Sequence, residues 1–511
     1  MNKVLKALVA VAATAAMAVA GFAGASTAMA DTATGSIKVA EGDSHTYTVY
    51  QVFTGTYGSD GSLGDVKPGT DFKADNGAGD NGTNLTAAKA AEALAKIEST
   101  KSDQEKLTEI LKFASLSTPY TQSDLTAAAP LTNVPAGYYL AKDKDNTVTG
   151  NDAQTLYIVN VVGNSEVTIT RKADKPTLEK KVKDTNDSTG STTDWQDSAD
   201  YDVNDDVPFQ LTATLPGDAN DFAAYKTYKL VFHDQQSAGL TFKPETVVVK
   251  YEGTTLNTGS YTLDQNPTDG HTFDITISNA KSVKDTDGAP ITVANSGKFT
   301  VEYKSTLNEN AVIGSTGNPN EASLEFSNNP NVGGEGETGK TPTDKVIVFT
   351  YQLDINKTFN GGTPAENDLP NFKLYKFDST TNDYTIDRGE VTITKTEDGK
   401  YTASFKRVDD GKYKLVETKT PAGFNTAADT LFEITADHDV ESDNPQLTVL
   451  KINTTAGNTT TGTVTADVVN QKGSNLPSTG GMGTVLLYVA GIAVFVLAGA
   501  TLVMALRRRN A

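Results

Sequence analysis

The chain has 511 residues, a formal net charge of −20 and no cysteine. An acidic balance of this size argues against nucleic-acid binding, which needs basic patches, and the absence of cysteine excludes disulfides between its domains. The length allows roughly three domains of 100–200 residues each.

The N-terminus has the pattern of a cleaved secretory signal. Two lysines precede an apolar stretch over 8–20, and Ala28–Ala30 fits the small-x-small rule for signal cleavage. We therefore expect residues 1–30 to be a signal peptide and the mature chain to begin near Asp31.

Residues 31–173 are predicted to form a first, β-rich domain with one helical insertion. Alternating patterns predict strands over 35–56, 137–141 and 155–170. Apolar residues at helical spacing occur over 86–114. No catalytic set emerges in this domain.

The second predicted domain, residues 174–343, opens with a lysine among apolar residues. On a strand, Leu178, Lys180 and Val182 face the same side, so Lys180 points where its apolar neighbours point. A lysine on a buried face is costly unless it is neutral or paired.

Two other polar residues suggest how that cost is met. Asp234 stands at the end of a predicted strand, and Asn328 is in phase with Leu324 and Phe326 on a later one. Asn329 is the alternative to Asn328 if a bulge shifts the strand register.

The third predicted domain, residues 344–473, repeats this pattern. Lys357 alternates with apolar residues on its first strand, and Asn470 is in phase with Val468 on its last. Glu417 lies on a strand between them. The alternative reading is that Lys357, Glu417 and Asn470 are solvated polar residues.

Lysine, carboxylic acid and asparagine can form an amide bond inside a core. Burial lowers a lysine's pKa and so favours the nucleophilic neutral amine, and it raises a carboxyl's pKa. A protonated Asp234 or Glu417 could then polarise the asparagine carbonyl and help ammonia to leave.

The sequence gives little support for an enzyme activity or a metal site. The four histidines, at 45, 233, 271 and 438, are dispersed without metal-ligand spacing, and no phosphate loop or nucleophile elbow appears. The turn at 285–288 lacks the full pattern of a calcium loop. We predict no enzyme activity, no cofactor and no metal.

The C-terminus, residues 474–511, combines three features in order. An uncharged run over 482–506 is long enough to cross a membrane as one helix, and three arginines follow it. The run is preceded by Leu476, Pro477, Ser478, Thr479 and Gly480. An ordinary C-terminal membrane anchor is the alternative.

This C-terminal arrangement resembles the cell-wall sorting signal of Gram-positive surface proteins, whose LPxTG motif is cut by a sortase. The resemblance implies that Thr479 becomes an acyl donor and that Gly480 onward is discarded. It also implies a secreted protein fixed to peptidoglycan.

The internal lysine sets resemble those of Ig-like pilin and adhesin domains. The order Lys180, Asp234, Asn328 is similar to CnaA-type domains, in which the lysine and the asparagine form an isopeptide bond. Residues 417–424 resemble the E-box of CnaB-type domains, ETxAPxGY, with Thr420 and Phe424 as mild departures. The resemblance implies a Lys357–Asn470 bond assisted by Glu417.

Residues 167–172 resemble the pilin motif of sortase-assembled pili, Val-Tyr-Pro-Lys, with Thr170 and Arg171 in place of Tyr-Pro. The resemblance implies that Lys172 attacks the acyl intermediate of another subunit. The competing lysines are Lys175, Lys181 and Lys183.

Together these resemblances imply a mainly β chain of tandem Ig-like domains that serves as the backbone subunit of a covalent pilus. Its partners would be pilin-class and housekeeping sortases, identical subunits, minor pilins, peptidoglycan and a host surface ligand. The alternative is a wall-anchored adhesin, or a minor pilin at the tip or base, that does not need Lys172.

Overall fold

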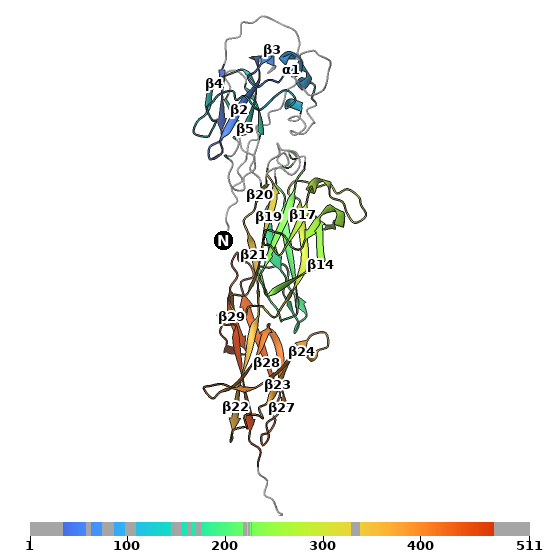
Figure 1. Cartoon of the computed structure of the whole chain (residues 1–511), viewed down its shortest axis with the longest axis vertical. Coiled ribbons are helices and arrows are strands. Elements are labelled where there is room, and N and C mark those ends of the chain that lie inside the picture. The colour runs from blue at the N-terminus through green and yellow to red at the C-terminus, as the bar shows by residue number, and fades with distance from the viewer. Residues whose placement is uncertain are drawn as a thin grey trace, which may run out of the picture. The chain divides into compact units, whose positions relative to one another are not determined.

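The computed structural model of the chain describes residues 34–57, 63–73, 86–97, 109–144, 147, 156–161, 166–169, 175–217, 222, 225, 227–328 and 338–474 (Figure 1). The predicted signal peptide, Lys172 and the LPxTG motif lie outside these residues, as does the predicted spanning helix over 482–506. Within the described ranges, no helix is long and apolar enough to cross a membrane.

The chain divides into two compact units. One comprises residues 1–352 with 406–411 and 434–464, and the other comprises 353–405, 412–433 and 465–511. Strands dominate the described residues of both units, which confirms the predicted mainly β fold.

The first group of strands forms two sheets, with orders β4-β1-β7 and β3-β2-β5-β6. Its elements are β1 (Thr34–Val39), β2 (Tyr47–Tyr57), β3 (Leu63–Pro68), α1 (Ala87–Ala95), β4 (Leu131–Pro135), β5 (Gly137–Asp143), β6 (Leu156–Val161) and β7 (Glu166–Ile169). Helix α1 begins inside the predicted helical region, where the Thr86 hydroxyl accepts a hydrogen bond from the Lys89 amide.

Strand β2 is buried on both faces. Tyr47 and Val49 belong to one hydrophobic cluster, and Val52 and Phe53 belong to another. The pairing of β2 with β5 shifts register between Gln51 and Phe53, and this bulge brings Phe53 to the cluster that Val52 also joins.

The second group of strands forms two larger sheets that face each other across one core (Figure 1). The sheet with order β15-β14-β18-β12-β8 consists of β8 (Thr177–Val182), β12 (Asp206–Thr214), β14 (Leu240–Tyr251), β15 (Thr254–Thr255) and β18 (Lys298–Leu307). The sheet with order β11-β21-β19-β13-β17-β16 consists of β11 (Ser198–Asp200), β13 (Leu230–Gln236), β16 (Thr262–Asp264), β17 (Phe273–Ile277), β19 (Asn318–Ser327) and β21 (Asp344–Phe349), with β20 (Thr338–Lys340) also pairing with β19. Three small elements complete the group: the hairpin β9 (Thr185–Asn186) and β10 (Ser191–Thr192), and the short helices η1 (Thr258–Ser260) and η2 (Ala280–Ser282).

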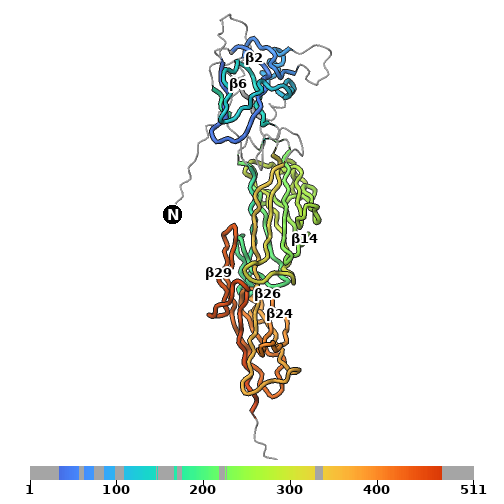
Figure 2. The backbone as a smooth tube through the Cα atoms, turned by 60° about the vertical axis from the view of Figure 1, so that its left-hand side comes forward, coloured from blue at the N-terminus to red at the C-terminus, as the bar shows by residue number. Residues whose placement is uncertain are grey.

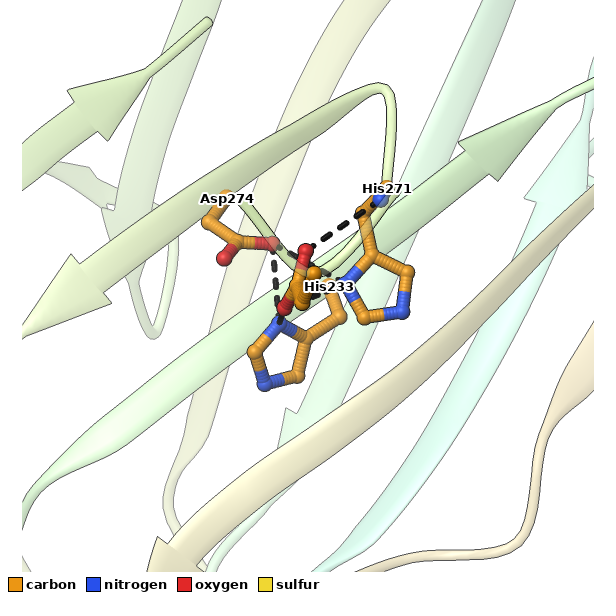
Figure 3. Close-up of side chains that lie close together, drawn as sticks. His233, His271 and Asp274 are labelled. Atoms are coloured by element: carbon orange, nitrogen blue, oxygen red, sulfur yellow. Dashed lines mark hydrogen bonds and ion pairs between the residues drawn. The ribbon is translucent and has the colours of Figure 1, made fainter. Parts of the chain in front are cut away.

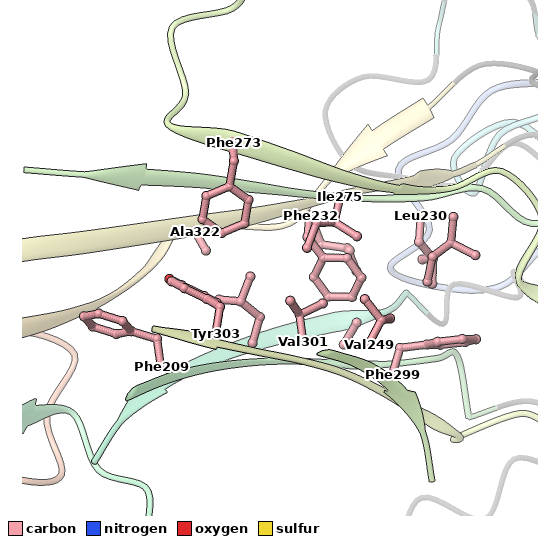
Figure 4. Close-up of a cluster of buried hydrophobic side chains, with 14 of the residues drawn as sticks. Phe209, Leu230, Phe232, Val249, Phe273, Ile275, Phe299, Val301, Tyr303 and Ala322 are labelled. Atoms are coloured by element: carbon pink, nitrogen blue, oxygen red, sulfur yellow. The ribbon is translucent and has the colours of Figure 1, made fainter. Parts of the chain in front are cut away.

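Side chains from both sheets interdigitate in this core. Figure 4 shows Phe209 and Val301 from one sheet pointing toward Phe232 and Phe273 from the other. Alternation along each strand supplies these inward-facing residues.

Strand β21 lies just after the predicted domain boundary at 343–344, yet it pairs with β19 and β11 of the second group. The strands change to another sheet at Thr350 instead. Because Asp344–Phe349 lies between β11 and β19 in a sheet of the second sandwich, the predicted start of the third domain at residue 344 falls about six residues too early.

The third group forms two sheets, with orders β25-β26-β22-β31 and β24-β23-β27-β28-β29-β30 (Figure 2). Its strands are β22 (Tyr351–Asn360), β23 (Asn371–Asp378), β24 (Asp383–Thr392), β25 (Thr394–Lys395), β26 (Tyr401–Val408), β27 (Gly411–Lys419), β28 (Thr430–His438), β29 (Leu447–Ile452), β30 (Thr455–Ala456) and β31 (Thr463–Gln471). The first and last strands, β22 and β31, are neighbours in one sheet.

Candidate isopeptide sites

Lys180 lies in the core of the second sandwich. Strand β8 is the edge of its sheet, and alternation turns the Lys180 side chain inward, where none of it is exposed. Its Nζ lies 2.5 Å from Asp234 Oδ2 and 2.9 Å from the Tyr303 hydroxyl. The Tyr303 hydroxyl donates to the same Asp234 oxygen at 2.6 Å.

Burial sets the protonation states of this pair. It lowers the pKa of Lys180 and raises the pKa of Asp234, although each partner's charge opposes the shift of the other. Both shifts act toward the neutral amine and the neutral carboxylic acid. The neutral amine is the form in which lysine can act as a nucleophile.

Asn320, on β19, completes the group. Its side chain is fully buried, its amide nitrogen donates to the Tyr303 hydroxyl at 2.8 Å, and its Oδ1 is buried without a hydrogen-bond partner. Tyr303 therefore contacts the lysine, the acid and an asparagine at once. Its ring stacks on Phe209 and meets Phe273 edge-on, which holds the hydroxyl in place (Figure 4).

The predicted partner of Lys180, Asn328, is wrong. In the register of β13 with β19, Asp234 lies opposite Ala322, and Asn320 is two residues away from that point. Asn328 lies six residues along in the other direction, about 20 Å at roughly 3.3 Å per residue. A lysine side chain bound to Asp234 cannot span that distance. The alternative, Asn329, lies outside the described residues.

The set predicted in the third domain does lie close together in the structure. Lys357 on β22 is buried, and its Nζ donates to the Val468 carbonyl on β31 at 3.3 Å. Asn470 on the same strand is fully buried and donates from Nδ2 to Glu417 Oε2 at 2.9 Å. The Lys357–Asn470 bond itself stays a prediction.

The electrostatics of this set also favour reaction. Burial lowers the pKa of Lys357 to about 8, against a smaller opposing effect of Glu417. Glu417 Oε1 and Asn470 Oδ1 are both buried without hydrogen-bond partners. The Ala427 amide and the Asn425 carbonyl fix the other ends of these two side chains.

Sequence reasoning missed two members of the second site and one histidine pair. Tyr303 and Asn320 belong to no motif, and only strand register reveals them. The prediction that the histidines are dispersed is wrong for His233 and His271, whose ring centroids are 4.7 Å apart.

Comparisons with known proteins agree with this architecture. A family model described as SpaA, prealbumin-like fold domain, matches residues 361–446. The trypsin-resistant surface T6 protein of Streptococcus pyogenes serotype M6 is 29% identical over 310 residues, which cover 57% of this chain and 50% of that protein. The chain thus aligns with about half the length of this curated relative.

Solved structures extend the likeness across most of the chain. The T6 backbone pilin of S. pyogenes serotype M6, described as a modular three-domain structure, superposes with a TM-score of 0.50 at 19% identity, covering 88% of this chain and all of that one. The full-length major pilin SpaD of Corynebacterium diphtheriae gives 0.46 at 17% identity over 87% and 98% of the two chains.

The fold is therefore that of a modular Gram-positive pilin, and the resemblance to backbone pilins is confirmed. The T6 pilin is similar to this chain both in sequence and in fold.

Proposed function

We propose that the chain is the structural backbone subunit of a covalent pilus on a Gram-positive cell surface. The observation that carries the proposal is the pair of buried lysine–acid–asparagine sets in successive β domains. The T6 relative is named a surface protein and a backbone pilin, which supports a structural rather than an enzymatic role.

Each internal bond would form by a single transamidation. The neutral Lys180 amine attacks Cγ of Asn320, the new C–N bond replaces the C–NH₂ bond, and the lysine proton passes through the Asp234 carboxyl to the departing ammonia. Lys357, Glu417 and Asn470 would react in the same way. Folding supplies the proximity, worth an effective molarity of up to about 10⁵–10⁸ M, so no enzyme is needed.

Polymerisation would use the two segments that sequence analysis singled out. A pilin-class sortase would cleave between Thr479 and Gly480 and transfer the Thr479 acyl group to Lys172 of another subunit. A housekeeping sortase would finally join the last subunit to peptidoglycan, and minor pilins would complete the fibre.

The test replaces Lys172 with alanine in cells that express the chain together with its sortases, with Lys175→Ala as the matched control. Wall extracts of wild type and of the control should give high-molecular-weight ladders on immunoblots, and Lys172→Ala should give monomer only. A ladder that persists in Lys172→Ala would assign the acceptor to another lysine. Monomer in all three strains would favour the wall-anchored adhesin.

A further inference from the structure

Two histidines and two aspartates converge on the outer face of the second sandwich. His233 lies on β13, beside Asp234 but on the opposite face of the sheet, and it pairs across the strands with Asp274 on β17. Asp269 and His271 lie in the turn between β16 and β17. Figure 3 shows the two imidazoles and the Asp274 carboxylate directed at one another.

Four ligand-type atoms surround a common point. His233 Nδ1 lies 2.8 Å from Asp274 Oδ1 and 3.6 Å from Asp269 Oδ2. His271 Nδ1 lies 2.8 Å from Asp269 Oδ2 and 3.5 Å from Asp274 Oδ1. Nitrogen and oxygen therefore alternate around a closed ring, and all four atoms lie within 4.8 Å of one another.

Four of the six separations among these atoms can be compared with those around a tetrahedral ion. Ligand bonds of about 2.0–2.2 Å in tetrahedral geometry place neighbouring ligand atoms about 3.3–3.6 Å apart. The four ring distances, 2.8 to 3.6 Å, lie at or just below that range. Small side-chain rotations would open the shorter pairs.

A fifth side chain has the position of a supporting group. Glu325 on β19 places Oε2 3.6 Å from His233 Nε2, the ring nitrogen that faces away from the other three side chains. Metal-bound histidines commonly direct their second nitrogen at a carboxylate, which fixes the tautomer and the ring orientation. His233 is itself only 5% exposed, so its orientation is set by packing.

Hydrogen bonds between these side chains explain the arrangement less completely than a bound cation does. One N–H on each imidazole satisfies one carboxylate, but each Nδ1 faces two. The ring also holds two carboxylates close together, and a divalent cation would neutralise both. Two imidazole ligands disfavour calcium and magnesium, which take oxygen ligands, and suit zinc.

We propose that His233, Asp269, His271 and Asp274 form a zinc site, with Glu325 orienting His233. Bound zinc would tie the turn over 265–272 to β13, the strand that carries Asp234 on its other face. The zinc site would then stabilise this sheet on the face opposite to the second isopeptide set. This inference does not depend on polymerisation or on the internal bonds.

The test titrates the purified, chelator-treated chain with Zn²⁺ against a chromogenic competitor, and separately with Co²⁺ as a visible probe. The variants are His271→Ala and Asp269→Asn. The matched control is Asp287→Asn, which removes the same charge from an exposed turn of the same domain. Circular dichroism of each metal-free protein checks the fold.

Wild type and Asp287→Asn should bind one zinc per chain, give the intense visible bands of four-coordinate cobalt and melt higher with zinc than without. Loss of a supporting carboxylate alone costs about 10–100-fold in affinity, so loss of a ligand should weaken binding by at least about 100-fold. Equal affinity in all four proteins would overturn the assignment, and so would the absence of stoichiometric binding in wild type.

Discussion

One pair of substitutions can distinguish Asn320, on β19, from Asn328, the residue after that strand, as the bonding partner of Lys180. Asn320→Ala should abolish the bond to Lys180, because it removes the only asparagine in the described part of the chain that shares a hydrogen-bond partner with that lysine. Asn328→Ala is the matched control, because it removes the same group eight residues further along the chain, about 26 Å away at roughly 3.3 Å per residue.

The magnitude follows from the loop that the bond closes. Joining residue 180 to residue 320 encloses about 140 residues, and by analogy with a disulfide this removes about 5 kcal/mol of unfolded-chain entropy. For a domain of this size, 1 kcal/mol shifts the midpoint of thermal unfolding by about 2–4 °C, so Asn320→Ala should melt roughly 10–20 °C lower.

The assay is intact-mass spectrometry of the purified chain, followed by a thermal melt. Each bond releases one ammonia, so wild type and Asn328→Ala should both be lighter than their sequences by about 34 Da, and Asn320→Ala by about 17 Da. If Asn328→Ala lost the bond and Asn320→Ala kept it, the register argument would be refuted. A wild-type mass equal to that of the sequence would refute both bonds.

Three further predictions concern the reacting groups. Glu417→Gln should prevent the third-domain bond, so the protein should be lighter than its own sequence by about 17 Da instead of about 34 Da, and a deficit of about 34 Da would remove Glu417 from the reaction. Tyr303→Phe should slow formation of the second-domain bond by about 10²–10³-fold, followed by mass during refolding, because the hydroxyl that joins lysine, acid and asparagine is lost. In Asn470→Ala the Lys357 amine stays free, with a pKa of about 8 in the folded state against 10.5 for the unperturbed group. The unfolded chain then binds more protons between these values, so stability to urea should rise from pH 8 to 10.5 in this variant, and a flat profile would contradict the burial argument.

Alternation along strands was enough to find the lysines. Lys180 and Lys357 stand in phase with apolar residues, and both prove to be buried. Glu417 and Asn470 were found because a family motif and the end of a strand mark them. These signals are local in the sequence, so they can be recognised without knowledge of the fold.

The predictions that fail are those that depend on how strands far apart in the sequence pair with one another. Asn320 on β19 and Asn328, the residue after that strand, are an even number of residues apart, so periodicity cannot choose between them, and only the pairing of β19 with β13 does. His233 and His271 are 38 residues apart in the chain, and the β13–β17 pairing brings them together. Strand β21 joins the sheet of the second sandwich, and no local sequence pattern indicates which sheet a strand at a domain boundary joins.

If Asn320 is the partner of Lys180, part of the chain lies outside both covalently closed loops. If Lys180 is bonded to Asn320 and Lys357 to Asn470, a pull along the fibre bypasses residues 181–319 and 358–469, but it passes through 321–356. That stretch holds the rest of β19, with β20 and β21 paired to it, and its described residues are held by noncovalent contacts, namely strand hydrogen bonds and buried side chains such as Leu324 and Val348. Its 36 residues could extend to about 120–130 Å before any covalent bond took the strain. Under load, each subunit could then lengthen reversibly between two segments that the covalent bonds keep from extending. A fibre of many subunits would lengthen under a sudden pull in the same way.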